Sequence, residues 1–444
     1  MVMHKMRASS YLRRTISEPF SRRRLSTLLS LPPRAELQEG LMQPPTSELP
    51  SYIPTYTSYT DLLGLKQILS HWLYLLLVFV PIGLASGHLQ WGDSTTFWTN
   101  FIAMIPLAAL LGTLTEELAI HTGDLVGGLV NATFGNAVEM IITVQTLRAG
   151  LIDVVQGTLL GSILSNLLLV LGMSFFAGGM YHYVQKFNAQ GATCSTSLLM
   201  LASFAFITPT VASIHNPNPE DILKISRYTA LLIAVTYVLF LFFQLYTHLQ
   251  LFKDGSEETP GRSDSGSFRS FEGEEVAAIS LWTSVIGLLV VTLMVAIQSD
   301  QLVGSINGVS QSSGMNQNFI GIILLPIVGN AAEHVTAVTV AIKNKPDLTM
   351  GVAVGSSTQI AMFMVPFAVL VGWGMNIPMT LAFSSVSATV LAFSTLIVIG
   401  IVQDGESNWL EGVMLIVAYF IVAIVFWFDS GSSSTLTSAV SGQL

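Results

Sequence analysis

Long apolar runs constrain the fold of this chain more than any other feature. A helix that crosses the hydrocarbon core of a bilayer needs about 20 apolar residues, and eleven runs of roughly that length occur here. Charged residues make up only 10% of the chain, against roughly a quarter in soluble proteins. The runs therefore predict an all-α polytopic membrane protein with about eleven transmembrane helices. They lie near 67–89, 97–120, 125–147, 154–181, 194–214, 228–249, 277–299, 318–342, 348–374, 377–401 and 408–428.

Polar segments divide the chain into five parts. Residues 1–60 form a basic tail, whose composition indicates disorder, and 251–276 form an acidic linker rich in Gly and Ser. Six of the runs lie in 61–250 and five in 277–428, and a short tail follows at 429–444. The single cysteine, Cys194, excludes an internal disulfide. The sequence has no basic patch with interleaved aromatic residues, so we expect no nucleic-acid partner.

The positions of lysine and arginine predict the orientation. Loops on the cytosolic side of a membrane protein carry an excess of these residues. If the N-terminus is cytosolic, the opposite side keeps only Arg148, Lys224 and Arg227. We therefore expect the basic tail and the acidic linker to lie in the cytosol.

Two patterns in the basic tail have a form that a basophilic kinase accepts. They read Arg-Arg-Thr-Ile-Ser at 13–17 and Arg-Arg-Arg-Leu-Ser at 22–26. A phosphate on Ser17 or Ser26 would add about −1.5 to −2 charges and weaken attraction to the acidic linker. Two interpretations stay open. The tail hinders the cytosolic entrance until a kinase acts, or it is an unstructured segment with a trafficking role or none.

The strongest internal signal is a repeat at a constant offset of 194 residues. GNAVE at 135–139 recurs as GNAAE at 329–333, and GSILSN at 161–166 recurs as GSSTQI at 355–360. Nine of the 28 positions in 135–162 are identical to their partners in 329–356. The copies lie in the third and the eighth run, five spans apart, and this odd offset means that they cross the membrane in opposite directions. Inverted repeats are typical of secondary transporters. Helices 2–6 and 7–11 would form the two halves, with an extra N-terminal helix.

The repeated glutamates, Glu139 and Glu333, are the predicted metal ligands. Both lie inside apolar spans that offer no Lys or Arg partner, so a bound cation is the natural counter-charge for groups that are costly to bury. Two facing carboxylates cannot both stay ionised and empty, because like charges repel strongly in a low dielectric. Binding of one divalent ion, or protonation of the carboxylates, removes this repulsion. The two events exclude each other, and this exclusion is the physical basis of an exchanger. Hard oxygen ligands suit calcium and also manganese. The alternative is a pair of protonated carboxyls that only hold helices together.

Small and polar neighbours complete the predicted site for cation binding and proton coupling. Asn136 and Asn330 each precede a repeated glutamate by three residues and share its helical face. Gly135 and Gly329 allow the helix to unwind, so that backbone carbonyls can turn toward the ion. Taken singly, such residues more often serve helix–helix contact. The remaining polar candidates are Ser162, Asn166, Ser356 and Gln359.

Three further residues are candidates for a proton relay or the cytosolic entrance. His334 follows Glu333 and either shuttles protons or packs as a hydrogen-bonded histidine. Glu116 and Glu117 lie near the end of the second run and either take part in transfer or are solvated. We expect no cofactor beyond the transported ion and protons.

These motifs resemble the calcium/cation antiporter superfamily, and within it the cation/proton exchanger branch of plant, algal and fungal vacuoles. The likeness rests on GNAVE at 135–139, GNAAEH at 329–334, LLGSILSNLLLVLG at 159–172 and ILLPIVGNAAEH at 323–334. It covers about 61–428. The resemblance implies proton-driven loading of calcium into the vacuole, a location in the vacuolar membrane and an inhibitory N-terminal tail. Sodium/calcium exchangers of the same superfamily differ before the repeated Glu, which disfavours sodium coupling.

Alternatives from other classes remain at this point. A sodium- or potassium-coupled exchanger would use the same carboxylates, and a cation channel would conduct without proton counterflow. An intramembrane hydrolase is disfavoured because Ser162 and Ser356 have no His or Asp at catalytic spacing. We therefore expect a transporter rather than an enzyme. The sequence leaves the oligomeric state open.

Overall fold

The computed structural model describes residues 58–216, 218–248 and 277–429. The predictions for Ser17, Ser26, the acidic linker at 251–276 and the C-terminal tail after Asp429 lie outside these residues.

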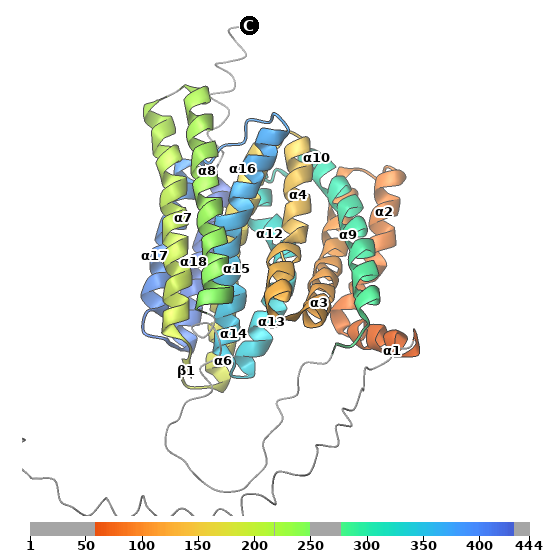
Figure 1. Cartoon of the computed structure of the whole chain (residues 1–444). Coiled ribbons are helices and arrows are strands. Elements are labelled where there is room, and N and C mark those ends of the chain that lie inside the picture. The colour runs from red at the N-terminus through yellow and green to blue at the C-terminus, as the bar shows by residue number, and fades with distance from the viewer. Residues whose placement is uncertain (1–57, 217, 249–276, 430–444) are drawn as a thin grey trace, which may run out of the picture. The chain divides into compact units, whose positions relative to one another are not determined.

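The first half begins with α1 (Ser58–Ile68), which is bent by 93° from the helical pair that follows it. α3 (Asp93–Phe134) is kinked at Gly123, which has a φ of 78°. Figure 1 shows the succession of helices that follows. The other elements are η1 (Trp72–Val78), α2 (Phe79–His88), α4 (Ala137–Arg148), α5 (Ile152–Leu164), η2 (Ser165–Val170), α6 (Leu171–Tyr181), β1 (Gln185–Lys186), α7 (Ala189–His215), α8 (Pro219–Phe242) and η3 (Phe243–Thr247).

Short π-helical turns, which are rare in proteins but often occur at functional sites, interrupt several long helical segments. In the second half these are η5, η6 and η7, and in the first half η2 lies between α5 and α6. The elements are α9 (Leu281–Gly304), α10 (Ile306–Ser313), α11 (Gln317–Phe319), η5 (Ile320–Leu324), α12 (Leu325–Gly329), α13 (Ala331–Ile342), α14 (Pro346–Met350), η6 (Gly351–Gly355), α15 (Ser356–Gln359), η7 (Ile360–Met364), α16 (Val365–Gly374), α17 (Ser385–Val402), β2 (Glu406–Ser407) and α18 (Trp409–Phe428).

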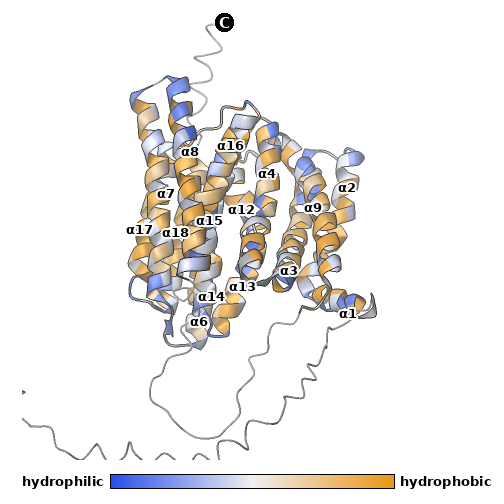
Figure 2. Cartoon of the chain, in the orientation of Figure 1, coloured by the Kyte–Doolittle hydropathy of each residue, from blue (hydrophilic) through white to orange (hydrophobic). Residues whose placement is uncertain are grey.

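Apolar helices dominate, as the sequence predicts for a polytopic membrane protein. Eight helices among the described residues are long and apolar enough to cross a membrane, or up to ten if each of two bent pairs is one span. Figure 2 shows apolar residues along the helices and hydrophilic ones at the α7–α8 turn. On α8, large side chains such as Leu232 and Leu239 are exposed. A lipid environment accounts for such surfaces.

The structure differs from the predicted runs in three places. The first span begins at Trp72 rather than 67, because His71 caps η1 by accepting the Leu73 N–H. Residues 377–384 are not helical, and α17 starts at Ser385 with Ser384 as its N-cap. The helix α10 occupies a segment with no predicted element and ends at Gly314, which has a φ of 71°.

Packing between the halves follows the repeat. α3 packs on α9 and α7 packs on α17, and both are pairs of equivalent helices. The contact of α6 with α18 recurs as the contact of α16 with α8. Each contact therefore has a partner related by exchange of the halves, which confirms the two inverted repeats.

The helical bundle has two end faces, which we call the linker face and the opposite face. The linker face carries the end of α8 and the start of α9, and also the β1–β2 pair, where Lys186 and Glu406 form an ion pair of 2.9 Å. The opposite face carries the α7–α8 turn and the α4–α5 turn. In Figure 1 the linker face is at the bottom.

Candidate cation-binding site

Both repeated motifs lie at breaks in long helical segments. Asn136 separates the end of α3 from α4 with φ −110° and ψ 22°, and Asn330 separates α12 from α13 with φ −91° and ψ 15°. The second break bends the span by 57°. The predicted unwinding at Gly135 and Gly329 therefore occurs one residue later, at the asparagine.

Each repeated glutamate occupies the first turn of the helix that starts at a break. Glu139 is in the first turn of α4 and Glu333 in the first turn of α13. The free N–H groups and the dipole of a helix N-terminus favour negative charge there. The breaks thus place two helix N-termini near the middle of the bundle, each with its own carboxylate.

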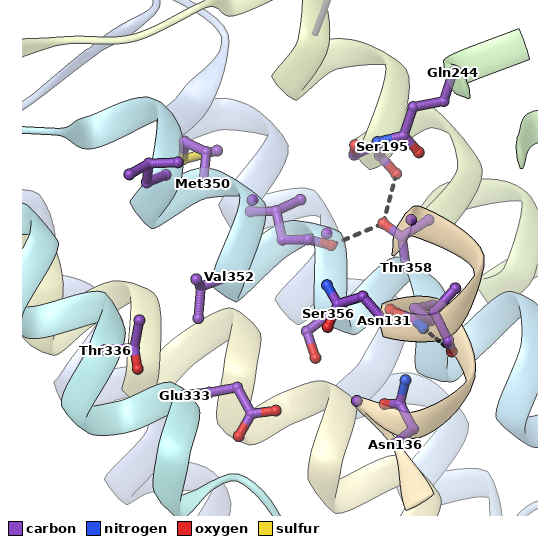
Figure 3. Close-up of a pocket in the computed structure, with 18 of the residues that line it drawn as sticks. Asn131, Asn136, Ser195, Gln244, Glu333, Thr336, Met350, Val352, Ser356 and Thr358 are labelled. Atoms are coloured by element: carbon purple, nitrogen blue, oxygen red, sulfur yellow. Dashed lines mark hydrogen bonds between the residues drawn. The ribbon is translucent and has the colours of Figure 1, made fainter. Parts of the chain in front are cut away.

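The two carboxylates differ in their surroundings. Glu139 is buried, with 3% of its surface exposed, and its Oε1 lies 2.9 Å from the position that a Cβ would take on Gly329. Glu333 is half-buried and lines a cavity. Figure 3 shows its carboxylate below Ser356, pointing toward Asn136.

Hydrogen bonds between the halves hold the site together. Asn166 Nδ2 donates to Ser356 Oγ over 3.1 Å, and Asn330 Nδ2 donates to the Ser162 carbonyl over 3.2 Å. Gln359 donates to the Ala132 carbonyl, which belongs to the last turn of α3. Each bond joins a residue of one repeat to a residue of the other.

Several buried oxygen atoms of the site have no hydrogen-bond partner within the described residues. Leaving a buried polar group unpaired costs roughly 1–3 kcal/mol, so a ligand that pairs these atoms would be stabilised by them. Carboxylate, amide and hydroxyl oxygens are what a hard cation binds, and carboxylates also take protons. The atoms are Glu139 Oε2, Glu333 Oε2, Asn166 Oδ1, Asn330 Oδ1, Ser162 Oγ and Thr143 Oγ1.

A cavity of about 520 Å³ adjoins this cluster, and Glu333 is the member of the cluster that lines it. Its lining also includes Asn136 and Ser356, and Asp347 and Gln244 at the start of α14 and in η3. Because the start of α14 and the end of the α8–η3 segment lie at the linker face, the cavity extends toward that face. Among the described residues, its lining contains no Lys or Arg. The described residues contain no group of three His, Cys, Asp or Glu side chains placed to hold a metal ion; the cluster's other oxygens are amides and hydroxyls.

His334 is oriented by the break that precedes it. Its Nδ1 is 2.5 Å from the Asn330 carbonyl oxygen, which only accepts, so Nδ1 carries the proton. Nε2 is then an acceptor, and it is buried without a partner. The Nε2 lone pair of His334, the residue after Glu333 in α13, can therefore accept a proton.

The predicted site residues of the repeat lie at the two helix breaks or in the hydrogen bonds between the halves. Glu116 and Glu117 of α3, in contrast, have different surroundings. Glu116 lines the cavity. Glu117 instead accepts the Ala278 N–H over 2.8 Å and the Ile279 N–H over 3.4 Å, so it fastens the segment before α9 and does not reach the cavity. The candidates at the two breaks and in the cross-half bonds are Gly135, Asn136, Glu139, Ser162, Asn166, Gly329, Asn330, Glu333, Ser356 and Gln359.

Some site residues are absent from the sequence prediction. Thr143 lies one turn after Glu139 on the same helical face, a spacing that could have identified it, but its repeat partner is Ala337. Ser195 and Gln244 line the cavity from α7 and η3, two elements outside the aligned repeat, so no sequence signal marked them.

The inverted halves, the paired helix breaks and the two central carboxylates define a secondary transporter for cations. The chain belongs to the sodium/calcium exchanger protein family, which matches residues 94–246 and 283–428. It is 41% identical to the vacuolar calcium ion transporter of Schizosaccharomyces pombe over 84% of this chain and 89% of that protein. It is 44% identical to the Ca(2+)/H(+) antiporter of Synechocystis over 80% of this chain and 96% of that protein. Its fold matches the solved structure of native YfkE with a TM-score of 0.68 and 35% identity, over 80% of this chain and 99% of that one.

Proposed function

We propose that this chain is a secondary antiporter that exchanges calcium for protons across an internal membrane of the vacuolar type. One observation carries this proposal. Two carboxylates, one from each inverted repeat, stand among unpaired oxygens, and the cavity that Glu333 lines has no Lys or Arg side chain among the described residues. Such a site attracts positive charge and has only bound cations or protons to balance it.

Competition between ions for the same oxygens supplies the coupling. A divalent ion needs Glu139 and Glu333 as anions, since calcium binds through oxygen ligands at about 2.3–2.6 Å. A proton on either carboxylate removes a negative charge and an acceptor lone pair. Bound calcium and bound protons are therefore alternatives at one site. His334, with its free Nε2, and Glu116, in the cavity, offer routes by which protons reach and leave Glu333.

The names of the relatives support calcium as the transported ion and the vacuolar membrane as the location. Those from Schizosaccharomyces pombe and Synechocystis are named as a vacuolar calcium ion transporter and a Ca(2+)/H(+) antiporter. A relative from Oryza sativa, 43% identical over 363 residues, is named vacuolar cation/proton exchanger 3. Manganese, which accepts similar oxygen ligands, is a further substrate to be tested.

The distribution of basic residues supports a cytosolic linker face. Lys66, Lys186, Lys343 and Lys345 all lie at or next to the helix ends on this face, while Arg148 and the α8 residues Lys224 and Arg227 lie toward the opposite face. An excess of Lys and Arg marks the cytosolic side. In this orientation the cavity opens to the cytosol, from which calcium is loaded.

Transport in vesicles of purified protein tests the proposal. With calcium-45 outside and an acidic interior, we expect uptake that a protonophore abolishes and that added manganese reduces. A sodium or potassium gradient of the same size should drive none. Uptake that follows the sodium gradient would place the chain with sodium-coupled exchangers, and calcium flux without proton counterflow would make it a channel.

We propose that the basic tail inhibits transport. The tail and the acidic linker carry opposite charge and are both expected on the cytosolic side, which motivates a test in which residues 2–50 are deleted. We expect a faster initial rate at low calcium, and a partial increase in the double variant Ser17→Asp and Ser26→Asp. An unchanged rate, with equal amounts of protein in the membrane, would leave the tail without this role.

A further inference from the structure

The repeat retains a second pair of acidic residues, which the central site does not use. Two of the nine identical positions in the repeat carry charge. One is the pair Glu139 and Glu333, and the other is the pair Asp153 and Asp347. Asp153 is in the first turn of α5 and Asp347 in the first turn of α14. Because the halves are inverted, these turns lie at opposite ends of the bundle, Asp153 at the opposite face and Asp347 at the linker face.

Asp347 lies in the wall of the cavity. It lines the cavity together with Asn188 and Gln244, and the other carboxylates of the described lining are Glu116 and Glu333. Its Oδ1 accepts the Asn188 N–H over 2.6 Å, at the start of α7. Within the described residues, no Lys or Arg forms an ion pair with Asp347. Its negative charge is therefore not neutralised by a neighbouring basic side chain.

This charge has the opposite sign to the basic residues around it. Lys66, Lys186, Lys343 and Lys345 lie at or next to helix ends on the linker face, and the last two are exposed in the same turn as Asp347. They repel a divalent cation that approaches the protein, and none of them lines the cavity. A cleft lined by one sign of charge raises the local concentration of ions of the other sign. The carboxylate of Asp347 thus favours cations where the surrounding lysines oppose them.

We propose that Asp347 and Asp153 are entrance residues for the cation, one for each face of the membrane. Each attracts the hydrated ion from its own side, before the ion loses water and reaches Glu139 and Glu333. This role presupposes the proposed exchange of cations at the central site, and it adds the residues that first attract the ion.

Asp153 has the position that this role requires on the opposite face. It is exposed next to the α4–α5 turn and lies outside the cavity that extends toward the linker face. A site between inverted repeats is reached from both faces in turn. Asp153 therefore takes the place of Asp347 when the site is open toward the opposite face.

A purely structural role would also retain an aspartate at both positions. A carboxylate in the first turn stabilises a helix through the helix dipole, and Asp347 in addition accepts the Asn188 N–H. Asparagine separates the two roles of Asp347. Asp347→Asn keeps an oxygen that accepts this N–H and removes only the charge.

The KM for calcium tests the charge. Uptake of calcium-45 is measured in vesicles whose linker face is outward. At low ionic strength, Asp347→Asn should raise KM roughly three- to tenfold, the effect of one charge on a divalent ion across about 6–12 Å of water. The rate at saturating calcium should stay at the parent level, and Asp347→Glu should keep the parent KM. In about 1 M salt the Debye length is about 3 Å, so the difference in KM should largely disappear.

Asp404→Asn is the matched control. Asp404 is exposed at the linker face outside the cavity, and its Oδ1 accepts the Glu406 N–H over 3.1 Å. The control should keep the parent KM. An unchanged KM for Asp347→Asn at low ionic strength, in vesicles whose parent protein exchanges calcium for protons, overturns the proposal. Absence of exchange by the parent protein would instead contradict the proposed function.

Asp153→Asn tests the assignment of one residue to each face. The same vesicles are loaded with calcium and release it in exchange for external protons. The KM for internal calcium should rise with Asp153→Asn and stay at the parent value with Asp347→Asn. If both variants change KM on the same side of the membrane, the assignment by face is wrong.

The electrostatic potential in the cavity gives a readout that needs no transport. The reporter is Gln244→Cys, in the cavity lining, with Cys194→Ser to remove the native thiol. A cationic methanethiosulfonate reagent should react faster with the reporter than an anionic reagent of similar size. Asp347→Asn should lower this ratio of rates severalfold, and Asp404→Asn should leave it unchanged. An equal ratio with and without Asp347→Asn would show that Asp347 does not attract cations to the cavity.

Discussion

The carboxylate of Glu139 in one half lies against Gly329 in the other. Its Oε1 is 2.9 Å from the place of a Cβ on Gly329, the last residue of α12. The equivalent glycine, Gly135, faces its own helix, since a Cβ there would meet the Asn131 carbonyl oxygen at 2.5 Å. The two repeats therefore hold their carboxylates differently, one buried between halves and the other facing the cavity.

Gly329→Ala tests this contact. The added methyl group would push the Glu139 carboxylate from its position, and overpacking of this kind costs about 1–3 kcal/mol. We expect calcium affinity to fall by roughly 5- to 150-fold, since a tenfold change corresponds to about 1.4 kcal/mol. Gly400→Ala serves as control, measured by calcium binding to purified protein. Equal affinities for the two variants would mean that Glu139 does not depend on Gly329.

Replacing either repeated glutamate should stop exchange. Glu139→Gln and Glu333→Gln each remove a charge that balances the divalent ion while keeping shape and hydrogen-bonding atoms. We expect no calcium uptake by either variant, with normal insertion into the membrane. Glu139→Asp and Glu333→Asp should keep only part of the activity. The negative charge remains, but the carboxylate is withdrawn by about 1.5 Å from an ion that needs a ligand distance of about 2.3–2.6 Å. Robust uptake by a purified Gln variant would remove that residue from the site.

Thr143→Val tests a residue that the structure adds to the site. The two side chains have nearly the same shape, so packing is conserved while the unpaired Oγ1 is lost. If this hydroxyl completes the cluster when the ion is bound, affinity for calcium should fall roughly 10- to 150-fold, the range for about 1.5–3 kcal/mol in a bond to a charged group. A hydroxyl without a role would leave the affinity unchanged or improve stability. Thr146→Val, one turn further along and already bonded to Ile142 O, is a suitable comparison.

The sequence predicts those parts of the molecule that the repeat or the bilayer determines. Apolar runs locate the spans because lipid requires them to be helical. Identical residues at an offset of 194, such as Glu139 and Glu333, predict the candidate site, and the structure places both in the first turns of helices that start at breaks. Asn136 and Asn330 were predicted as ligands, and the structure shows that they also end helices.

The sequence does not predict how the two halves differ in structure. Equal sequence positions cannot show that Glu333 faces a cavity while Glu139 is buried, because this difference arises from the packing around each residue and not from the repeated residues themselves. Glu116 and Glu117 are neighbours in sequence, and only the direction of each side chain assigns one to the cavity and the other to the segment before α9. Ser195 and Gln244 reach the cavity through packing of helices without a repeat signal.

Proton release on calcium binding tests the central claim most directly. Purified protein in a weakly buffered solution with a pH indicator is mixed with calcium, under conditions in which the unoccupied carboxylates hold protons. If calcium and protons share Glu139 and Glu333, calcium should release protons from the parent protein, and the double variant Glu139→Gln and Glu333→Gln should release none. Tight binding of calcium by the parent protein without proton release would contradict exchange at a shared site.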